Sequence, residues 1–433
     1  MLERLFKLTE NKTSVRTEIV AGITTFMTMA YILAVNPGIL SEAGMDKGAV
    51  FTATVIASAL ATLVMAFVAK LPFALAPGMG LNAFFAYTVC IGMGHSWQFA
   101  LTAVFLEGLV FIALTAFNIR EMMVNAIPVN VKHAISVGIG LFIAFIGFKN
   151  AGVVVDDPAT LVRLGNVTDI VTNASPLVAL IGLIITGALL GLGIKGALLI
   201  GIVVSTVLSI PFGIAHLPET FDFTPPSIAP VFGQFEWTQI FTTDMAIVLI
   251  TFLFVDMFDT VGTLIGVSSK ADMLDKNGNV PRAKQALFAD AIGTTAGALL
   301  GTSTVTTYVE SAAGVAAGGR TGLTAATTGV MFILALFLAP LFLMIPAAAT
   351  APALILVGAM MITPIRKIDL DDFTESIPVF LTIIIMPLTF SIADGIVFGM
   401  ISYVLLKLLT LQHRQISWVM YLLAALFVMK FFI

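Results

Sequence analysis

Long apolar runs separated by short polar connections follow one another along almost the whole chain, from residue 18 to residue 433. A helix needs about 20 apolar residues to cross a bilayer. By that measure the first half holds candidate spans at 19–40, 49–69, 78–93, 99–118, 132–148, 175–193 and 196–215. The second half holds candidates at 245–268, 284–301, 309–319, 322–344, 351–364, 377–391 and 393–411. The pattern predicts an all-α polytopic membrane protein with 14 transmembrane segments.

Short sequence matches recur in the two halves in the same order. The matches are LTA at 101–103 and 323–325, Ile127-Pro128 and Ile345-Pro346, and Val137-Gly138 and Val357-Gly358. Because seven spans is an odd number, a second seven-span repeat would be inverted relative to the first, as in many secondary transporters. The alternative is that Leu, Ala and Gly match by chance in membrane sequence.

The repeat predicts the domain organisation. We expect a cytoplasmic N-terminus at 1–18, a first repeat at 19–215, an extracytoplasmic loop at 216–243, a second repeat at 244–411 and a C-terminal apolar tail at 412–433. The sequence leaves open whether the apolar part of the tail, 416–433, spans the membrane or lies at its surface.

The composition excludes a water-soluble globule. Of the 433 residues, 59% are hydrophobic and 11% are charged, whereas about a quarter of the residues of soluble domains are charged. The single Cys90 excludes an intrachain disulfide. No run of Lys or Arg suggests nucleic acid. Because no zinc-ligand spacing, nucleotide loop or Ser/His/Asp arrangement occurs, we expect no metal, no cofactor and no enzyme.

Lys and Arg are distributed unevenly between alternate connections. Cytoplasmic loops of membrane proteins are enriched in these residues. With the N-terminus inside, the outer side holds only Lys47, Lys149 and Arg163, and the loop 216–243 holds none. We therefore expect a multi-pass protein of the cell (inner) membrane with both termini cytoplasmic.

Two candidate spans, 78–93 and 309–319, are too short to cross as helices, and each lies beside a helix break. Pro72 and Pro77 favour extended backbone over 72–76, with a half-helix beginning near Gly78. The β-branched run 301–310 should also be extended. If the two stretches lie side by side, they can pair as short strands, and the half-helices would aim N–H groups at one central point. The alternative is that both are re-entrant connections packed for stability.

Several carboxylates fall inside apolar runs, where ionisable groups are functional candidates by default. Asp256 and Asp259 share a helix face with Thr260 and Thr263. Two close carboxylates in low dielectric make a proton carrier plausible, although one of them could cap a broken helix instead. Glu310 lies beside the second break. For Glu107, a structural role is as compatible with the sequence as a functional one. Asp290 is expected near a cytoplasmic helix end.

Three segments resemble a known family: APGMGLNAFFAYT (76–88), FVDMFDTVGT (254–263) and TSTVTTYVESAAGVAAGGRTGLTA (302–325). They are similar to AzgA-like purine permeases of the nucleobase-cation symporter-2 (nucleobase-ascorbate transporter) superfamily, and the likeness covers nearly the whole chain. The resemblance implies two inverted seven-helix repeats with short strands in spans 3 and 10. It also implies a core domain at 19–118 and 244–344 and a gate domain at 124–215 and 347–411.

The resemblance also implies the site. Asp259 occupies the position of a substrate-binding Glu in uracil and xanthine carriers. Glu310 occupies the position of a second binding carboxylate, and Tyr308 is expected to line the site. Thr263 stands where the uracil carrier has a His linked to proton coupling, so the proton path does not carry over. The remaining candidates are Asp256 and Thr260 for coupling, and the backbone N–H groups of Gly78, Gly80 and Ser311 for substrate acceptors.

The function implied is import of adenine, guanine or hypoxanthine by proton symport, through movement of the core against the gate. The sequence does not decide which purine is preferred, whether H+ or Na+ is the coupling ion, or whether the carrier is a homodimer. The alternatives are a carrier of xanthine, uracil or an anion on a related fold and, remotely, an intramembrane aspartyl protease. A protease needs its two Asp residues on different helices, whereas Asp256 and Asp259 share one.

Overall fold

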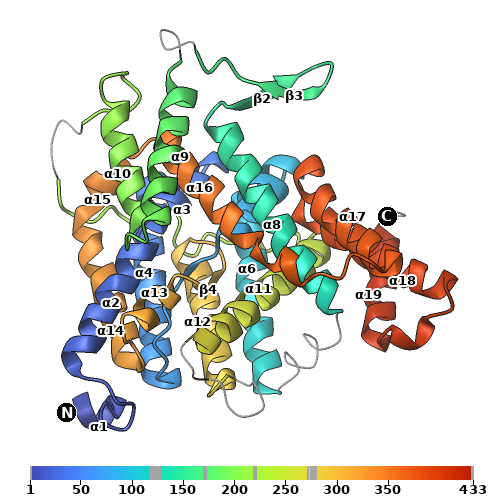
Figure 1. Cartoon of the computed structure of the whole chain (residues 1–433), viewed down its shortest axis with the longest axis horizontal. Coiled ribbons are helices and arrows are strands. Elements are labelled where there is room, and N and C mark those ends of the chain that lie inside the picture. The colour runs from blue at the N-terminus through green and yellow to red at the C-terminus, as the bar shows by residue number, and fades with distance from the viewer. Residues whose placement is uncertain are drawn as a thin grey trace.

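The chain folds into a helical bundle with a short pair of strands near its middle (Figure 1). The computed structural model describes residues 2–117, 128–168, 173–217, 222–270, 273 and 280–430. The helices of the first half are α1 (Leu2–Phe6), α2 (Val15–Met29), α3 (Ile32–Glu42), α4 (Lys47–Val64) with the π-helical extension η1 (Met65–Ala69), α5 (Met79–Ala83) with the π-helical extension η2 (Phe84–Gly92), α6 (Trp97–Ala116), α8 (Val129–Asn150), α9 (Ser175–Gly191) and α10 (Ala197–Ser209).

The second half holds a further set of helices. Its helices are α11 (Thr243–Lys270), α12 (Ala283–Leu300), α13 (Ser311–Ala316), α14 (Gly322–Ala335) with the 3₁₀ turn η3 (Leu336–Leu338) and α15 (Ala339–Leu343), α16 (Ala347–Met361) with the 3₁₀ turn η4 (Thr363–Lys367), α17 (Phe373–Thr389), α18 (Ile392–Leu409) with the 3₁₀ turn η5 (His413–Gln415), and α19 (Trp418–Lys430). Every predicted span overlaps at least one of these helices. The predicted helical membrane fold is therefore confirmed in its elements.

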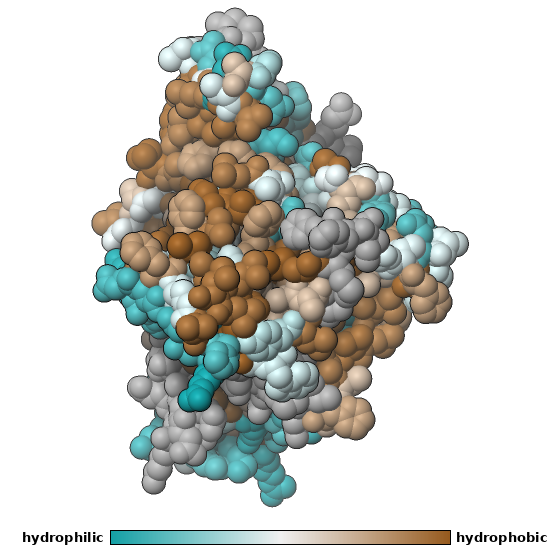
Figure 2. All heavy atoms as spheres, turned by 90° about the vertical axis from the view of Figure 1, so that its right-hand side faces the viewer, coloured by the Kyte–Doolittle hydropathy of each residue, from teal (hydrophilic) through white to brown (hydrophobic). Residues whose placement is uncertain are grey.

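Eight helical stretches of the described residues are long and apolar enough to cross a membrane, and four shorter helices are apolar. The count of 14 spans stays a prediction. Helix α19 has 13 residues and is therefore about 20 Å long, shorter than the roughly 30 Å hydrocarbon core. On the face shown in Figure 2, hydrophobic residues form a broad central band and hydrophilic residues gather toward the top and bottom.

The sequence matches between the halves fall on corresponding elements. LTA begins near the start of α6 and of α14, and Val137-Gly138 and Val357-Gly358 lie in α8 and α16. Pro128 and Pro346 each precede the first residue of those two helices. Ile127, residues 124–126 of the predicted gate domain and residues 218–221 of the predicted outer loop lie outside the described residues.

The helices pack in two groups. In one group, α14 packs on α2 and α4, and α12 packs on α4 and α6. In the other, α8 packs on α16 and α17, α9 on α10 and α16, and α17 on α18. Connections between the groups include the contact of α5 with α8 and that of α3 with α16.

Two breaks in the helices meet as an antiparallel strand pair, β1 (Leu75–Pro77) and β4 (Val305–Thr307). The register pairs Leu75 with Thr307 and Pro77 with Val305. Gly78 precedes α5 in extended conformation, so the predicted break and the start of the half-helix are both confirmed. The conditional pairing of the two stretches is confirmed as well. A second hairpin, β2 (Val154–Asp157) with β3 (Leu161–Leu164), follows α8.

Span one is also interrupted, between α2 and α3. The predicted span 19–40 lies within one helical stretch, Val15–Glu42, which is interrupted between the end of α2 at Met29 and the start of α3 at Ile32. Tyr31, at the junction of the two helices, reaches the second break. Pro37 lies inside α3 and lacks the N–H that would bond the preceding turn.

Helices α8 and α16 approach closely through a pair of glycines. A Cβ on Gly358 would lie 2.3 Å from the carbonyl oxygen of Gly140, and a Cβ on Gly140 would lie 2.7 Å from that of Gly358. Small residues allow such backbone contacts between membrane helices. The two helices that carry the Val-Gly match are therefore in direct backbone contact.

A buried carboxylate ties the start of α2 to the start of α14. Glu18 is fully buried, and its carboxylate accepts hydrogen bonds from the backbone N–H groups of Arg320, Thr321 and Thr324 and from the hydroxyls of Thr321 and Thr324, at 2.6–3.2 Å. The negative charge also faces the positive end of the α14 dipole. Glu18 is thus the N-terminal partner of a helix that begins more than 300 residues later in the chain.

We expect Gly358→Ala to lower thermal stability, because overpacking at a helix contact destabilises by about 1–3 kcal/mol. The matched control is Gly187→Ala in α9, where a Cβ meets nothing within 4 Å. The measurement is the melting temperature of the purified protein in detergent. Equal melting temperatures for both variants would contradict the close contact.

We also expect Glu18→Gln to lower the melting temperature, because an amide nitrogen would face N–H and O–H donors that need an acceptor. Leaving a buried donor without an acceptor lowers the free energy of unfolding by about 1–3 kcal/mol. The control Glu10→Gln changes an exposed carboxylate in the same N-terminal region. A Glu18→Gln protein as stable as the control would refute the capping role.

Candidate functional site

The second helix break carries Glu310, directly before α13. The side chain is half-buried, and its Oε1 accepts a hydrogen bond of 2.7 Å from the hydroxyl of Tyr31. Because Tyr31 belongs to the α2–α3 junction, this bond joins span one to the second break. Sequence reasoning missed Tyr31, although a tyrosine in the apolar run that also contains Pro37 is a detectable signal.

The first break lies opposite Asp259, on α11. A Cβ built on Gly78 would lie 3.6 Å from Asp259 Oδ2, so this carboxylate faces the first turn of the half-helix. Asp259 interacts electrostatically with Glu310 and with Tyr31. The structure therefore brings Asp259, Glu310 and Gly78 around one region at the two breaks, together with Tyr31.

Tyr308 is buried between the same breaks. Its hydroxyl donates a 2.5 Å hydrogen bond to the carbonyl of Pro77, and its N–H donates to the carbonyl of Ala74. Both bonds hold β1 against β4. In this structure the Tyr308 hydroxyl is therefore occupied by the chain itself, and what remains for a ligand is the ring.

The predicted backbone donors have partners of their own. The Gly78 N–H donates to Thr304 O at 3.0 Å, and the Ser311 N–H donates to Tyr308 O at 3.1 Å. The Ser311 hydroxyl accepts from the Ala74 N–H. In this structure strand pairing and helix initiation use the N–H groups of Gly78 and Ser311. Their predicted role in binding substrate acceptors stays a prediction.

Close packing against α8 leaves no space for a side chain at Gly80. A Cβ there would lie 2.7 Å from Ile139 Cγ2, on α8. Gly80 therefore permits the close approach of α5 to α8, which connects the two helix groups. Its predicted role in substrate binding stays a prediction.

A fully buried polar cluster lies behind the strands. The hydroxyl of Thr260 is 3.1 Å from Asp256 Oδ1, 2.8 Å from Asp290 Oδ1 and 2.6 Å from Thr306 Oγ1. Asp256, Thr260 and Asp290 are each fully buried. The expectation that Asp290 lies near a helix end is wrong, since it is well inside α12 (Ala283–Leu300).

The three contacts of Thr260 limit where protons can be. A hydroxyl donates one hydrogen and accepts two. If Thr260 donates to one carboxylate and accepts from Thr306, its remaining contact needs a hydrogen on the other carboxyl. One proton on either Asp256 or Asp290 would fit these contacts of Thr260. Sequence reasoning missed Asp290 because the two residues are more than 30 positions apart.

The remaining candidates have different surroundings. Thr263 is half-buried on α11, one turn beyond Asp259. Glu107 is fully buried, and its Oε2 accepts a 2.6 Å hydrogen bond from the hydroxyl of Thr304. Because Thr304 also accepts from the Gly78 N–H, Glu107 supports the backbone that leads into β4.

Known proteins similar to this chain are permeases. The family model described as Permease family (Xan_ur_permease) matches residues 16–398. The adenine permease AdeP of Escherichia coli is 45% identical over 99% of this chain and 96% of its own length. The guanine/hypoxanthine permease PbuG of Bacillus subtilis is 44% identical over 99% of both chains.

Among solved structures, the transmembrane domain of the cyanobacterial bicarbonate transporter BicA superposes with a TM-score of 0.66. The match covers 89% of this chain and 97% of that one, at 16% identity. At this identity the likeness shows a shared fold and nothing of the cargo. The family match and the two relatives cover nearly the whole chain, so the chain belongs to the Permease family, in agreement with its resemblance to the nucleobase-cation symporter-2 superfamily.

Proposed function

We propose that the protein imports purine nucleobases by proton symport. The observation that carries the proposal is the meeting of Asp259 and Glu310 at the paired helix breaks. Relatives named as adenine and guanine/hypoxanthine permeases, each matched over 99% of this chain, support the substrate class. Membership of a permease family makes the chain a transporter rather than an enzyme, which sets the protease alternative aside.

The chemistry of the two carboxylates suits a purine. A purine base presents N–H donors and ring-nitrogen or carbonyl acceptors in one plane. Carboxylates accept such N–H groups, so Asp259 and Glu310 can bind different edges of one base. The Tyr31 hydroxyl, now donating to Glu310, is the group available to turn toward a substrate acceptor. The buried ring of Tyr308 provides an apolar face for the base.

We assign proton coupling to the cluster of Asp256, Thr260 and Asp290. Thr260 also contacts Thr306 of β4, so the cluster touches the strand that ends near Glu310. Asp290 interacts electrostatically with Asp259. A change in charge at Asp259 on substrate binding would therefore act on the proton of the cluster. Thr263, three residues beyond Thr260 on α11, stays a further coupling candidate.

Transport in this proposal is a movement of one helix group against the other. The core consists of 19–118 and 244–344 and the gate of 124–215 and 347–411, with both termini cytoplasmic in the cell membrane. The separate packing of α2, α4, α12 and α14 from α8, α16 and α17 supports this division. In such a movement α5 would slide against α8 at the close approach of Gly80 to Ile139.

We expect Asp259→Asn and Glu310→Gln each to lower uptake of a labelled purine at least about tenfold, which corresponds to 1.4 kcal/mol of binding. The host is a strain without its own purine carriers. The matched control is Asp222→Asn in the exposed outer loop, with membrane levels of every variant measured. Uptake preserved in both site variants at normal membrane levels would reject the site.

A competition assay tests cargo and coupling together. Uptake should be reduced by at least one of adenine, guanine and hypoxanthine in excess, left unchanged by uracil, and abolished by a protonophore. Uptake that survives the protonophore and stops when Na+ is removed would contradict proton symport. Competition by uracil alone would contradict the purine assignment.

A further inference from the structure

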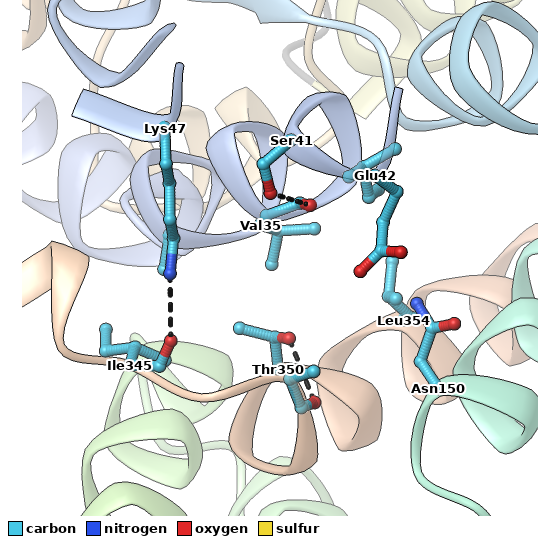
Figure 3. Close-up of a pocket in the computed structure, with 12 residues that line it drawn as sticks. Val35, Ser41, Glu42, Lys47, Asn150, Ile345, Thr350 and Leu354 are labelled. Carbon is cyan, nitrogen blue, oxygen red and sulfur yellow. Dashed lines mark hydrogen bonds between the residues drawn. The ribbon is translucent and has the colours of Figure 1, made fainter. Parts of the chain in front are cut away.

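A polar pocket lies away from the helix breaks, between α3 and the start of α4 on one side and α8 and α16 on the other. It has a cavity volume of ≈ 100 Å³ and is partly open to solvent. Figure 3 shows Lys47 on one side of the space, Glu42 and Asn150 on the other, and Thr350 between them. Val35 and Leu354 contribute apolar surface.

We propose that this pocket is an outer loading site for the purine base, occupied before the base reaches Asp259 and Glu310. The inference rests on the proposed function. It adds a site that neither the motifs nor the repeat indicated, on the side that carries Lys47 and Lys149.

The polar groups of the pocket suit a neutral ligand with both donors and acceptors. Within the described residues, the exposed Glu42 carboxylate has no hydrogen-bond or ion-pair partner, so it can accept N–H groups. The Lys47 Nζ donates to the carbonyls of Leu343 at 3.2 Å and Ile345 at 3.4 Å. Because an ammonium group has three donors, one remains for a ligand carbonyl or ring nitrogen. One negative and one positive side chain favour an uncharged purine over an anion.

The pocket and the central site are joined by one helix. Tyr31, which bonds Glu310, immediately precedes α3, and Glu42 is the last residue of α3. Eleven residues at 1.5 Å each separate them by about 17 Å along the axis. Between them, one face of α3 lines the pocket with Ala34, Val35, Gly38 and Ile39.

A contact between the two helix groups lies next to the pocket. The Asn150 side chain, which lines the pocket, donates a 2.9 Å hydrogen bond to the hydroxyl of Tyr87 on η2. Tyr87 and Phe390, at the end of α17, meet edge to face with centroids 6.1 Å apart. A ligand at Asn150 therefore sits where the proposed gate and core are in contact on this side.

Gly38 allows the pocket to be filled without disturbing the fold. It lines the pocket, and a Cβ built on it meets nothing within 4 Å. Gly38→Leu should therefore project into the space. In whole cells we expect it to raise the KM for hypoxanthine about tenfold with Vmax within about twofold, and Glu42→Gln to raise KM in the same direction. The controls are Gly187→Leu, a helix glycine with equally open surroundings, and Asp156→Asn on the exposed hairpin.

Equilibrium dialysis of hypoxanthine against the full-length protein in detergent separates the outcomes. The proposal expects two bound equivalents in the wild type and one in Gly38→Leu. One equivalent in the wild type, with KM unchanged in Gly38→Leu and Glu42→Gln, would overturn the loading site and leave the proposed function standing. A fall in Vmax with unchanged KM in Gly38→Leu would also overturn the loading site. A leucine that only blocks movement of the core against the gate would lower turnover and leave substrate binding unchanged. A wild type that binds and transports no purine overturns the proposed function, and the loading site with it.

Discussion

The structure depends on satisfying the backbone at two interruptions inside an apolar bundle, because unpaired N–H and C=O groups at membrane depth are strongly unfavourable. Pairing β1 with β4 satisfies the inner edges of both strands. The outer edges are satisfied by side chains: Thr62 bonds both backbone groups of Leu75, and Thr294 donates to Val305 O. Each break therefore depends for its backbone hydrogen bonds on a strand from the other half of the chain.

This requirement also explains why the candidate site is where it is. The strands interrupt two helices, and the next residues begin new half-helices at Gly78 and Ser311. Glu310 precedes one of these starts, and Asp259 faces the other. The polar groups that hold the strands, such as Ser311 and the Tyr308 hydroxyl, are consequently unavailable to a ligand. The carboxylates lie at the breaks without being needed to pair the strands, and this is compatible with the cargo-binding role proposed for them.

Local chemistry in the sequence was sufficient to predict the breaks. Pro72 and Pro77 exclude a regular helix, and the β-branched run 301–310 disfavours one, so both extended segments were predictable from the residues alone. The sequence could not show which backbone donors the strand pair would use, and in the structure the N–H of Gly78 bonds the carbonyl of Thr304. Asp290 was misjudged for a similar reason, because its partner Thr260 is on another helix and only tertiary packing joins them. The helix interruption at Tyr31 has no proline at the break itself and left no comparable local signal.

Helix α3 relates the two proposed sites in a way that a continuous span one would not permit. The junction between α2 and α3 separates α3 from the Glu18 carboxylate that caps α14. Its first end carries the Tyr31 hydroxyl bond to Glu310, and its last residue is Glu42 at the outer pocket. A base that takes the place of Tyr31 at Glu310 would release the near end of α3 and alter the pocket at its far end. Occupation of the central site would then change the outer site through one short helix, without any contact between the two ligands.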